Sequence, residues 1–181
     1  MNDRYLNFGF DRKTGEMLPE AKILLAWWNE LDTNTRDSAS LRRCDNINDV
    51  VFVPSFHKLL YRLKRAVDVK YYDSLAIVAC VISHIRENTG VKLATQMASS
   101  KGANVNSIVL IPRLNQLLSV RNSNVANSDD KDELLMRMIN VVKLLDGRAS
   151  VLDVANTIYW WNEKTKKDLS YAYYGKLFDK Q

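Results

Sequence analysis

The stretch from Leu75 to Ile82 constrains the fold more than any other part of this chain. Its eight residues read Leu-Ala-Ile-Val-Ala-Cys-Val-Ile, without a single charge. A helix that is apolar on almost all sides must be enclosed by other elements. We therefore expect a helix from about Tyr71 to Glu87 at the centre of a bundle. The run is too short to cross a bilayer, which takes about 20 apolar residues.

Helical signals outnumber strand signals along nearly the whole chain, so we predict an all-α fold. A chain of 181 residues is long enough for one domain with a proper core. We expect a single compact helical bundle over residues 1–181, in which two lobes can share one interface. The Ser-, Gly- and Asn-rich loop Ser99–Asn106 would separate an N-terminal lobe, about 1–98, from a C-terminal lobe, about 107–181.

Several helix starts can be read from the sequence. Proline is tolerated in a first turn, so helices are expected to begin at Pro19, Pro54 and Pro112. Ser128 and the acidic residues after it indicate another start, because carboxylates favour a helix N-terminus. We interpret these acidic residues as a helix start rather than a metal site, and expect this helix to stop at Gly147.

The last helix is expected to be capped by Asp153 and to run on toward the lysines that follow Trp161. The one β-like run is Ser107–Ile111. Its pattern leaves open whether it pairs with another segment.

The helix that begins at Pro54 separates apolar and basic residues onto two faces. Its apolar positions follow the i, i+3, i+4, i+7 rule: Phe56, Leu59, Leu60 and Leu63. Its basic positions lie on another face, with one beside the apolar stripe: Lys58, Arg62, Arg65 and Lys64. No Asp or Glu is interleaved between them to form i,i+4 pairs, so we expect this face to keep its positive field. A merely solvated face is the alternative.

Composition fits a compact binding protein. Hydrophobic residues make up 46% and charged residues 26% of the chain, which is ordinary for a globular protein and does not indicate disorder. The net charge of +5 is compatible with an acidic polymer as partner, or with solubility alone. Cys44 and Cys80 have no CxxC pairing and are expected to be reduced core thiols in a cytoplasmic protein. Met1 to Phe10 has no apolar stretch typical of a signal peptide.

A search for catalytic chemistry finds almost nothing. Neither His57 nor His84 has a neighbour at metal-ligand spacing, and no nucleophile elbow or phosphate-binding loop is present. A ribonuclease of the HEPN type needs an Arg a few residues before its His, and neither histidine has one. The Trp27-Trp28 pair is interpreted as core rather than as a base-stacking platform.

The order of short motifs resembles a known family, the CasB-type small subunit of the type I-E CRISPR surveillance complex, Cascade. In the first half the matching residues are Ala26, Trp27, Trp28 and Leu31, then Leu41, Arg42 and Arg43, then Pro54, Phe56 and Leu59. In the second half they are Leu93-Ala94, Ser99-Ser100-Lys101, Arg113 to Arg121, Val151-Leu152-Asp153, Tyr159-Trp160-Trp161 and Tyr171 to Tyr174. The resemblance covers nearly the full chain.

This resemblance implies an all-α subunit without catalytic activity or cofactor. The implied partners are the crRNA, both strands of the target DNA, the large and backbone subunits of Cascade and a second copy of the chain, with no membrane. In such a complex it would stabilise the crRNA/target duplex and the displaced strand. R-loop formation is a near-balanced exchange of duplexes, so modest contacts with backbone phosphates can tip it.

We expect a phosphate-binding track of Lys and Arg side chains, some of which must instead make ion pairs. Its N-terminal part would be Arg42, Arg43, Lys58, Arg62, Lys64 and Arg65. Its continuation would be Lys101, Arg113, Arg121, Lys164, Lys166 and Lys167. Two other classes stay open: a free-standing helical DNA- or RNA-binding regulator, and a catalytic protein, either a nuclease or a nucleotide enzyme. Metal-dependent cleavage that is lost on mutation of Asp129, Asp130 or Glu133 would indicate the second.

Overall fold

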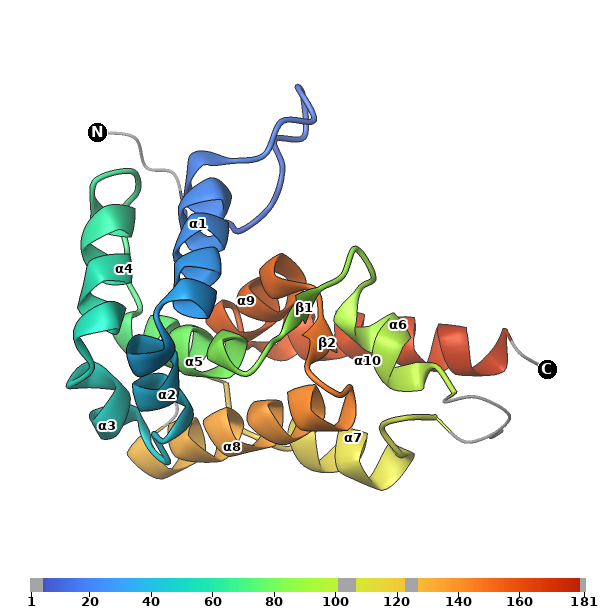
Figure 1. Ribbon diagram of the computed structural model, residues 1–181. Helices are drawn as coiled ribbons and strands as arrows, with labels where there is room; N and C mark the ends of the chain where they lie inside the picture. Colours follow the sequence, from blue (N-terminus) through green and yellow to red (C-terminus); the bar gives the residue numbers. More distant parts are fainter. Residues whose placement is uncertain (1–4, 101–106, 123–126, 180–181) are drawn as a thin grey trace.

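The computed structural model describes residues 5–100, 107–122 and 127–179. In these ranges the fold is all-α, as predicted, with ten helices and one pair of short strands (Figure 1). The helices are α1 (Pro19–Thr33), α2 (Thr35–Arg42), α3 (Ile47–Val51), α4 (Pro54–Lys64), α5 (Tyr72–Ser83), α6 (Leu93–Ala98), α7 (Ile111–Leu118), α8 (Ser128–Leu144), α9 (Val151–Tyr159) and α10 (Glu163–Phe178). The strands β1 (Glu87–Asn88) and β2 (Arg148–Ala149) pair in parallel.

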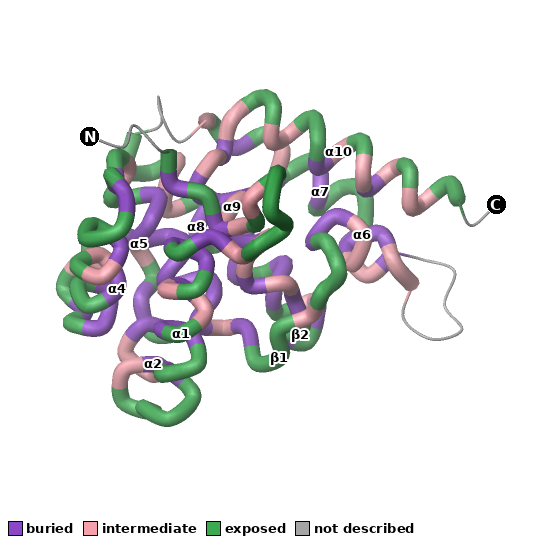
Figure 2. The backbone as a smooth tube through the Cα atoms, turned by 90° about the horizontal axis from the view of Figure 1, so that it is seen from above, coloured by how far each residue is buried: buried purple, intermediate pink, exposed green. Residues whose placement is uncertain are grey.

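Helix α5 forms the centre of the bundle, which confirms the prediction from its apolar run. All its residues from Ser74 to Ser83 are buried (Figure 2). It packs against α2, α3 and α4 from the first half of the chain and against α8 and α9 from the second half. No helix in the described ranges is both long and apolar enough to span a membrane.

The predicted C-terminal end of α5 is wrong. The helix stops at Ser83 instead of continuing to Glu87. The N–H groups of Arg86 and Glu87 donate to the carbonyl of Gly147 at 2.8 and 3.2 Å. A partner far along the chain thus takes the backbone bonds that another helical turn would have used, and β1 begins there.

The tryptophan pair lies in the core, as predicted. Trp27 is 1% exposed, and its indole N–H donates to the carbonyl of Ser55 in α4 at 2.9 Å. Trp28 donates to the carbonyl of Ile82 at the end of α5 at 3.1 Å. Figure 1 shows α1 and α4 side by side, and the two indoles tie α1 to α4 and to α5.

Helix starts at Pro19 and Pro54 are confirmed, and α7 begins one residue before Pro112. The predicted cap at Asp153 is wrong. Ser150 caps α9 instead, and the Asp153 carboxylate accepts a hydrogen bond from the Leu93 N–H at the start of α6 at 2.7 Å.

The acidic residues around Ser128 form a helix start, as predicted. Asn127 is the N-cap and makes a capping box with Asp130. Asp132 accepts a hydrogen bond from the Ile47 N–H at 2.8 Å and so caps the short helix α3. Within the described ranges no group of three His, Cys, Asp or Glu side chains could hold a metal ion.

The C-terminal region contains two helices rather than the single one predicted. Helix α9 ends at Tyr159, and Asn162 caps α10 by accepting a hydrogen bond from the Thr165 N–H at 3.0 Å. The cap lets the chain turn, so α10 lies against α6.

The β-like run Ser107–Ile111 forms an antiparallel bridge between Ser107 and Ser100. The N–H groups of Ile108 and Val109 donate to the carbonyls of Ser99 and Met97 at 2.8 and 3.0 Å. Its Val109 is fully buried, and the Val109 carbonyl accepts a hydrogen bond from the Tyr173 hydroxyl at 2.6 Å. The run therefore connects the end of α6 to α10 by backbone and side-chain hydrogen bonds.

Both cysteines are free and buried, as predicted. Burial raises the pKa of Cys44 to about 11 and that of Cys80 to about 12. Thiols with such pKa values carry almost no thiolate at neutral pH and are poor nucleophiles.

Candidate nucleic-acid interface

The basic face of α4 does not keep its full positive field. Lys58 lies 3.4 Å from Asp37 of α2. Arg62 makes two hydrogen bonds, of 2.7 and 3.0 Å, to the Glu30 carboxylate of α1. The expectation failed because it considered partners on the same helix, whereas tertiary packing brings carboxylates from two other helices.

The other two basic residues of α4 contact aromatic rings. The Lys64 ammonium lies 5.3 Å from the centre of the Tyr72 ring, and the Arg65 guanidinium lies 5.9 Å from that of Tyr61. Among the described residues neither has a carboxylate within ion-pair distance. Their charge is therefore available to a partner.

Three of the six predicted residues of the second group are engaged in ion pairs. The paired residues are Arg121 with Asp130 at 3.9 Å, Lys164 with Asp168 at 2.5 Å and Lys166 with Glu163 at 3.2 Å. Lys167 is exposed and has no such partner in the part of the chain that the structure describes. Lys101 lies outside the described residues.

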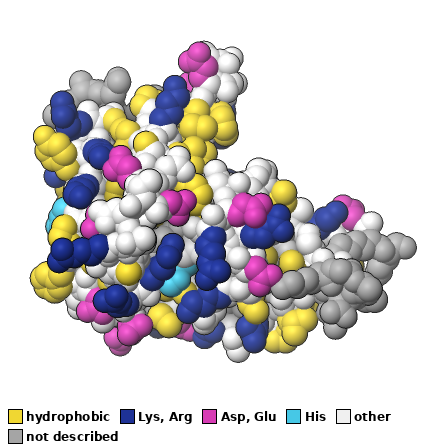
Figure 3. All heavy atoms as spheres, in the orientation of Figure 1, with side chains coloured by type: hydrophobic (Ala, Val, Ile, Leu, Met, Phe, Trp, Pro, Cys, Tyr) yellow, Lys and Arg dark blue, Asp and Glu magenta, His cyan; other side chains and the backbone are white. Residues whose placement is uncertain are grey.

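Three exposed cations meet at a cleft of about 270 Å³, which we call the central cleft. Its lining residues are Arg42, His84, Arg86, Lys143, Asp146 and Gly147. Figure 3 shows Lys and Arg side chains around a histidine near the middle of this face of the molecule. Of the predicted track residues that the structure describes, Arg42 is the one that lines this cleft.

The central cleft is built by the ends of three helices. Helix α8 ends in a Schellman motif, in which the Gly147 N–H bonds the Val142 carbonyl at 2.9 Å and the Asp146 N–H bonds the Lys143 carbonyl at 3.0 Å. The Gly147 carbonyl in turn accepts the N–H of Arg86. This contact fixes Arg86 and Lys143 on either side of the turn.

Arg42 enters the central cleft from the end of α2. Its Nε donates to the carbonyl of Ser83, at the C-terminus of α5, at 2.6 Å. A cation is favoured there because a helix C-terminus carries partial negative charge. The bond uses one of five guanidinium donors and leaves the positive charge without a carboxylate partner among the described residues.

His84 adds no charge to the central cleft at neutral pH. Burial lowers its pKa to about 4, and the charges of Lys143 and Arg42 act in the same direction. Its Nε2 atom is buried and has no hydrogen-bond partner within the described ranges. The charged side chains that line the cleft are thus Arg42, Arg86, Lys143 and the carboxylate of Asp146. Their excess of positive charge suits a phosphate group.

A second basic groove, of about 510 Å³, continues along α8. Arg137, Asn140 and Lys143 follow one another at intervals of three residues, so they share one side of the helix. Arg113 of α7 and Arg137 of α8 both line this groove. Arg137 makes an ion pair with Glu133 at 2.6 Å. The predicted Arg113 therefore lies on a surface that leads toward the central cleft.

Arg86 and Lys143 were not among the predicted site residues. Lys143 was visible only as a basic residue in the last turn of a helix, where it complements the helix dipole. The sequence predicts that Arg86 lies inside the central helix, but this helix, α5, ends at Ser83. Their meeting depends on the pairing of β1 with β2, which no local pattern reveals.

Replacing Gly147 by alanine is expected to lower the free energy of unfolding by about 2–3 kcal/mol. Gly147 has φ +73°, and a Cβ there would lie 3.2 Å from the His84 carbonyl oxygen and 3.2 Å from Arg86 Cγ. Gly15→Ala is the matched control, since its φ is +71° and a Cβ there meets nothing within 4 Å. Urea denaturation should show a larger loss for Gly147→Ala. Equal losses would mean that the central cleft adjusts to the added methyl group.

Two solved structures resemble this fold. The chain aligns with a chain of the crystal structure of E. coli Cascade bound to a PAM-containing dsDNA target, at a TM-score of 0.59 and 16% identity, over 91% of this chain and 99% of that one. It also aligns with CasB from Thermus thermophilus, at a TM-score of 0.62 and 18% identity, over 88% of this chain and 99% of that one. By fold, the chain is an all-α protein with the architecture of CasB.

The model of the family described as CRISPR-associated protein Cse2 matches residues 37–174. The chain belongs to this family, which confirms the resemblance to the CasB-type small subunit. No curated protein matches the chain significantly.

Proposed function

We propose that this protein is a non-catalytic subunit of a type I-E Cascade complex and binds nucleic-acid backbone through the central cleft. Its partners would be the crRNA, both strands of the target DNA, the large and backbone subunits and a second copy of the chain. By these contacts it would stabilise the R-loop in antiviral defence. Family membership supports this assignment, as does the likeness of the fold to a chain of E. coli Cascade bound to a dsDNA target.

The observation that carries the nucleic-acid role is the convergence of Arg42, Arg86 and Lys143 at one cleft. Three cations, of which Arg42 is held by a hydrogen bond to the Ser83 carbonyl, can neutralise phosphates without reading bases. Because the two duplexes exchanged in an R-loop differ little in stability, a few such contacts suffice to shift the balance.

The ion pairs divide the predicted track residues into stronger and weaker candidates for phosphate contacts. Residues without a carboxylate partner in the described ranges are the stronger candidates for phosphate contacts: Arg42, Arg43, Lys64, Arg65, Arg113 and Lys167. Residues already paired are weaker candidates: Lys58, Arg62, Arg121, Lys164 and Lys166. Exposed pairs contribute little stability, about 0–1 kcal/mol, so these residues can still exchange a carboxylate for a phosphate.

The assignment can be tested by purifying the affinity-tagged chain after co-expression with the Cascade subunits and guide RNA of its own host. We expect the chain to elute with the other subunits and with the guide RNA. Recovery of the chain alone, with DNA-binding activity of its own, would instead indicate a free-standing regulator. A Trp27→Ala chain, whose core should be weakened, serves as the control for unspecific retention.

A further inference from the structure

A strip of tyrosine and basic side chains lies at the junction of α4, the following segment and α5. We call it the tyrosine strip, and its members are Tyr5, Tyr61, Lys64, Arg65, Lys70 and Tyr72. Three of its members are exposed rings: Tyr5 is 63%, Tyr61 is 64% and Tyr72 is 44% exposed. Each of these rings carries a cation over its face, with Lys70 at 4.8 Å from Tyr5.

The strip is continuous because of local geometry. On α4, Lys64 and Arg65 follow Tyr61 by three and four residues, which places them on its side of the helix. In the extended segment after α4, Val67 and Val69 are buried while Asp68 and Lys70 point outward. Tyr5 forms a bridge with Asp68, which brings its ring to Lys70.

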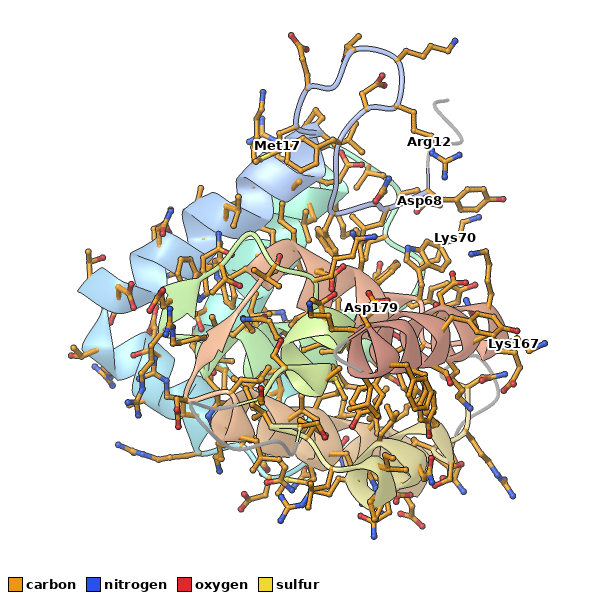
Figure 4. The ribbon with its side chains drawn as sticks, turned by 90° about the vertical axis from the view of Figure 1, so that its right-hand side faces the viewer. Arg12, Met17, Asp68, Lys70, Lys167 and Asp179 are labelled. Carbon is orange, nitrogen blue, oxygen red and sulfur yellow. The ribbon has the colours of Figure 1, made fainter. Side chains whose placement is uncertain are left out.

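The strip is separate from the central cleft. Figure 4 shows Asp68, Lys70 and Lys167 along one edge of the molecule, whereas α2, which carries Arg42, lies toward the opposite edge. Lys167 is followed four residues later on α10 by Tyr171, which is 75% exposed. Lys167 and Tyr171 thus place another basic side chain and another exposed tyrosine along this edge.

We propose that the tyrosine strip binds single-stranded nucleic acid by stacking unpaired bases on its tyrosine rings. In a duplex the base faces are already stacked on one another, so only unpaired bases can use an exposed ring. Lys64, Arg65 and Lys70 stand beside the rings, where they can neutralise the phosphates between stacked bases. The proposal rests on the proposed function only in taking nucleic acid as the ligand, and it adds a base contact to the backbone contacts of the central cleft.

A protein partner fits this surface less well. The cores of protein interfaces are depleted in lysine, whereas the strip places a lysine against two of its three rings. Several exposed aliphatic side chains and a methionine lie elsewhere, in the β1–α6 loop, around the start of α7 and on α8: Val91, Leu110, Ile111 and Met136. Asp68 lies beside the strip, close enough for its charge to act on Lys64. Lys70 follows Asp68 two residues later on the outward side of the same extended segment.

The test uses the full chain and a fluorescently labelled oligomer of thymidine nucleotides, with affinity measured by anisotropy. Replacing both Tyr61 and Tyr72 by alanine is expected to weaken binding by roughly tenfold or more per ring. The Tyr61→Phe, Tyr72→Phe variant should bind as the unchanged chain does, because stacking needs the ring and not the hydroxyl. Phe52→Ala, at a residue that is 82% exposed, is the matched control and should have no effect.

Salt dependence separates stacking from charge. The tyrosine variants should leave the slope of affinity against salt unchanged, whereas Lys64→Gln with Lys70→Gln should flatten it. Unchanged oligomer affinity in the double alanine variant would overturn the proposal. If that variant instead lost assembly with the other subunits, the strip would be a protein contact. Because the assay needs no complex, a failure here is distinct from a failure of the chain to assemble in Cascade.

Discussion

Replacing Trp27 by alanine is expected to lower the free energy of unfolding by about 3–5 kcal/mol. The indole is 1% exposed and fills the contact between α1 and α4, so its removal leaves a cavity that these helices cannot close. It also removes the N–H that donates to the Ser55 carbonyl at 2.9 Å. For a chain of this size, thermal denaturation should show a decrease in melting temperature of roughly 10 °C.

Two further variants identify the cause of this loss. Trp27→Phe keeps most of the volume but removes the hydrogen bond and a small part of the buried ring, so it should cost about 1–2 kcal/mol. Phe52→Ala, at an exposed aromatic position, should stay within about 0.5 kcal/mol of the unchanged chain. Unchanged stability of Trp27→Ala together with loss of nucleic-acid binding would make the tryptophan a stacking platform instead of core.

The positions of the helices could largely be predicted because their signals are local. The apolar run from Leu75 to Ile82 requires burial on all sides, and the structure encloses it. Pro19 and Pro54 begin helices because proline fits a first turn and not a later one. The acidic start of α8 follows from the helix dipole alone.

The errors in the fold concern bonds between distant parts of the chain. Helix α5 ends early because Arg86 and Glu87 bond to Gly147, which lies about 60 residues away in sequence. Asp153 has the right chemistry for a cap, but its carboxylate is used at α6 instead of at its own helix. Patterns within one helix cannot show which of two helices a carboxylate will serve.

Contacts between distant parts of the chain also limited the prediction of the site. The sequence correctly placed Lys58, Arg62 and Lys64 on one helix, whereas Arg65 lies just past its end as the C-cap. The pattern could not show that Glu30 would neutralise Arg62. The central cleft was missed because Arg86 and Lys143 meet only through the β1–β2 pair. A basic surface is a tertiary property, since both its cations and the carboxylates that neutralise them come from several elements.

Replacing Arg86 and Lys143 together by glutamine is expected to weaken binding of target DNA by the assembled complex by roughly 10- to 50-fold at physiological salt. Each cation contributes one phosphate contact, so the slope of log affinity against log salt should become shallower by about 2. Both side chains are exposed, so the fold should be retained. Gel-shift titration over a series of salt concentrations, with circular dichroism as the check on folding, measures both quantities.

The chain offers a control that removes the same charge from another surface. Lys58→Gln with Arg62→Gln also lowers the net charge by two, but these residues are already paired with Asp37 and Glu30. If phosphates sit in the central cleft, this control should change affinity only about twofold, because the two charges that it removes lie outside the lining of the cleft and act on a bound phosphate only through screened solvent. Equal effects of the two double variants would show that net charge alone attracts the DNA. Full affinity and an unchanged slope in the Arg86 and Lys143 variant would exclude the cleft as a phosphate site.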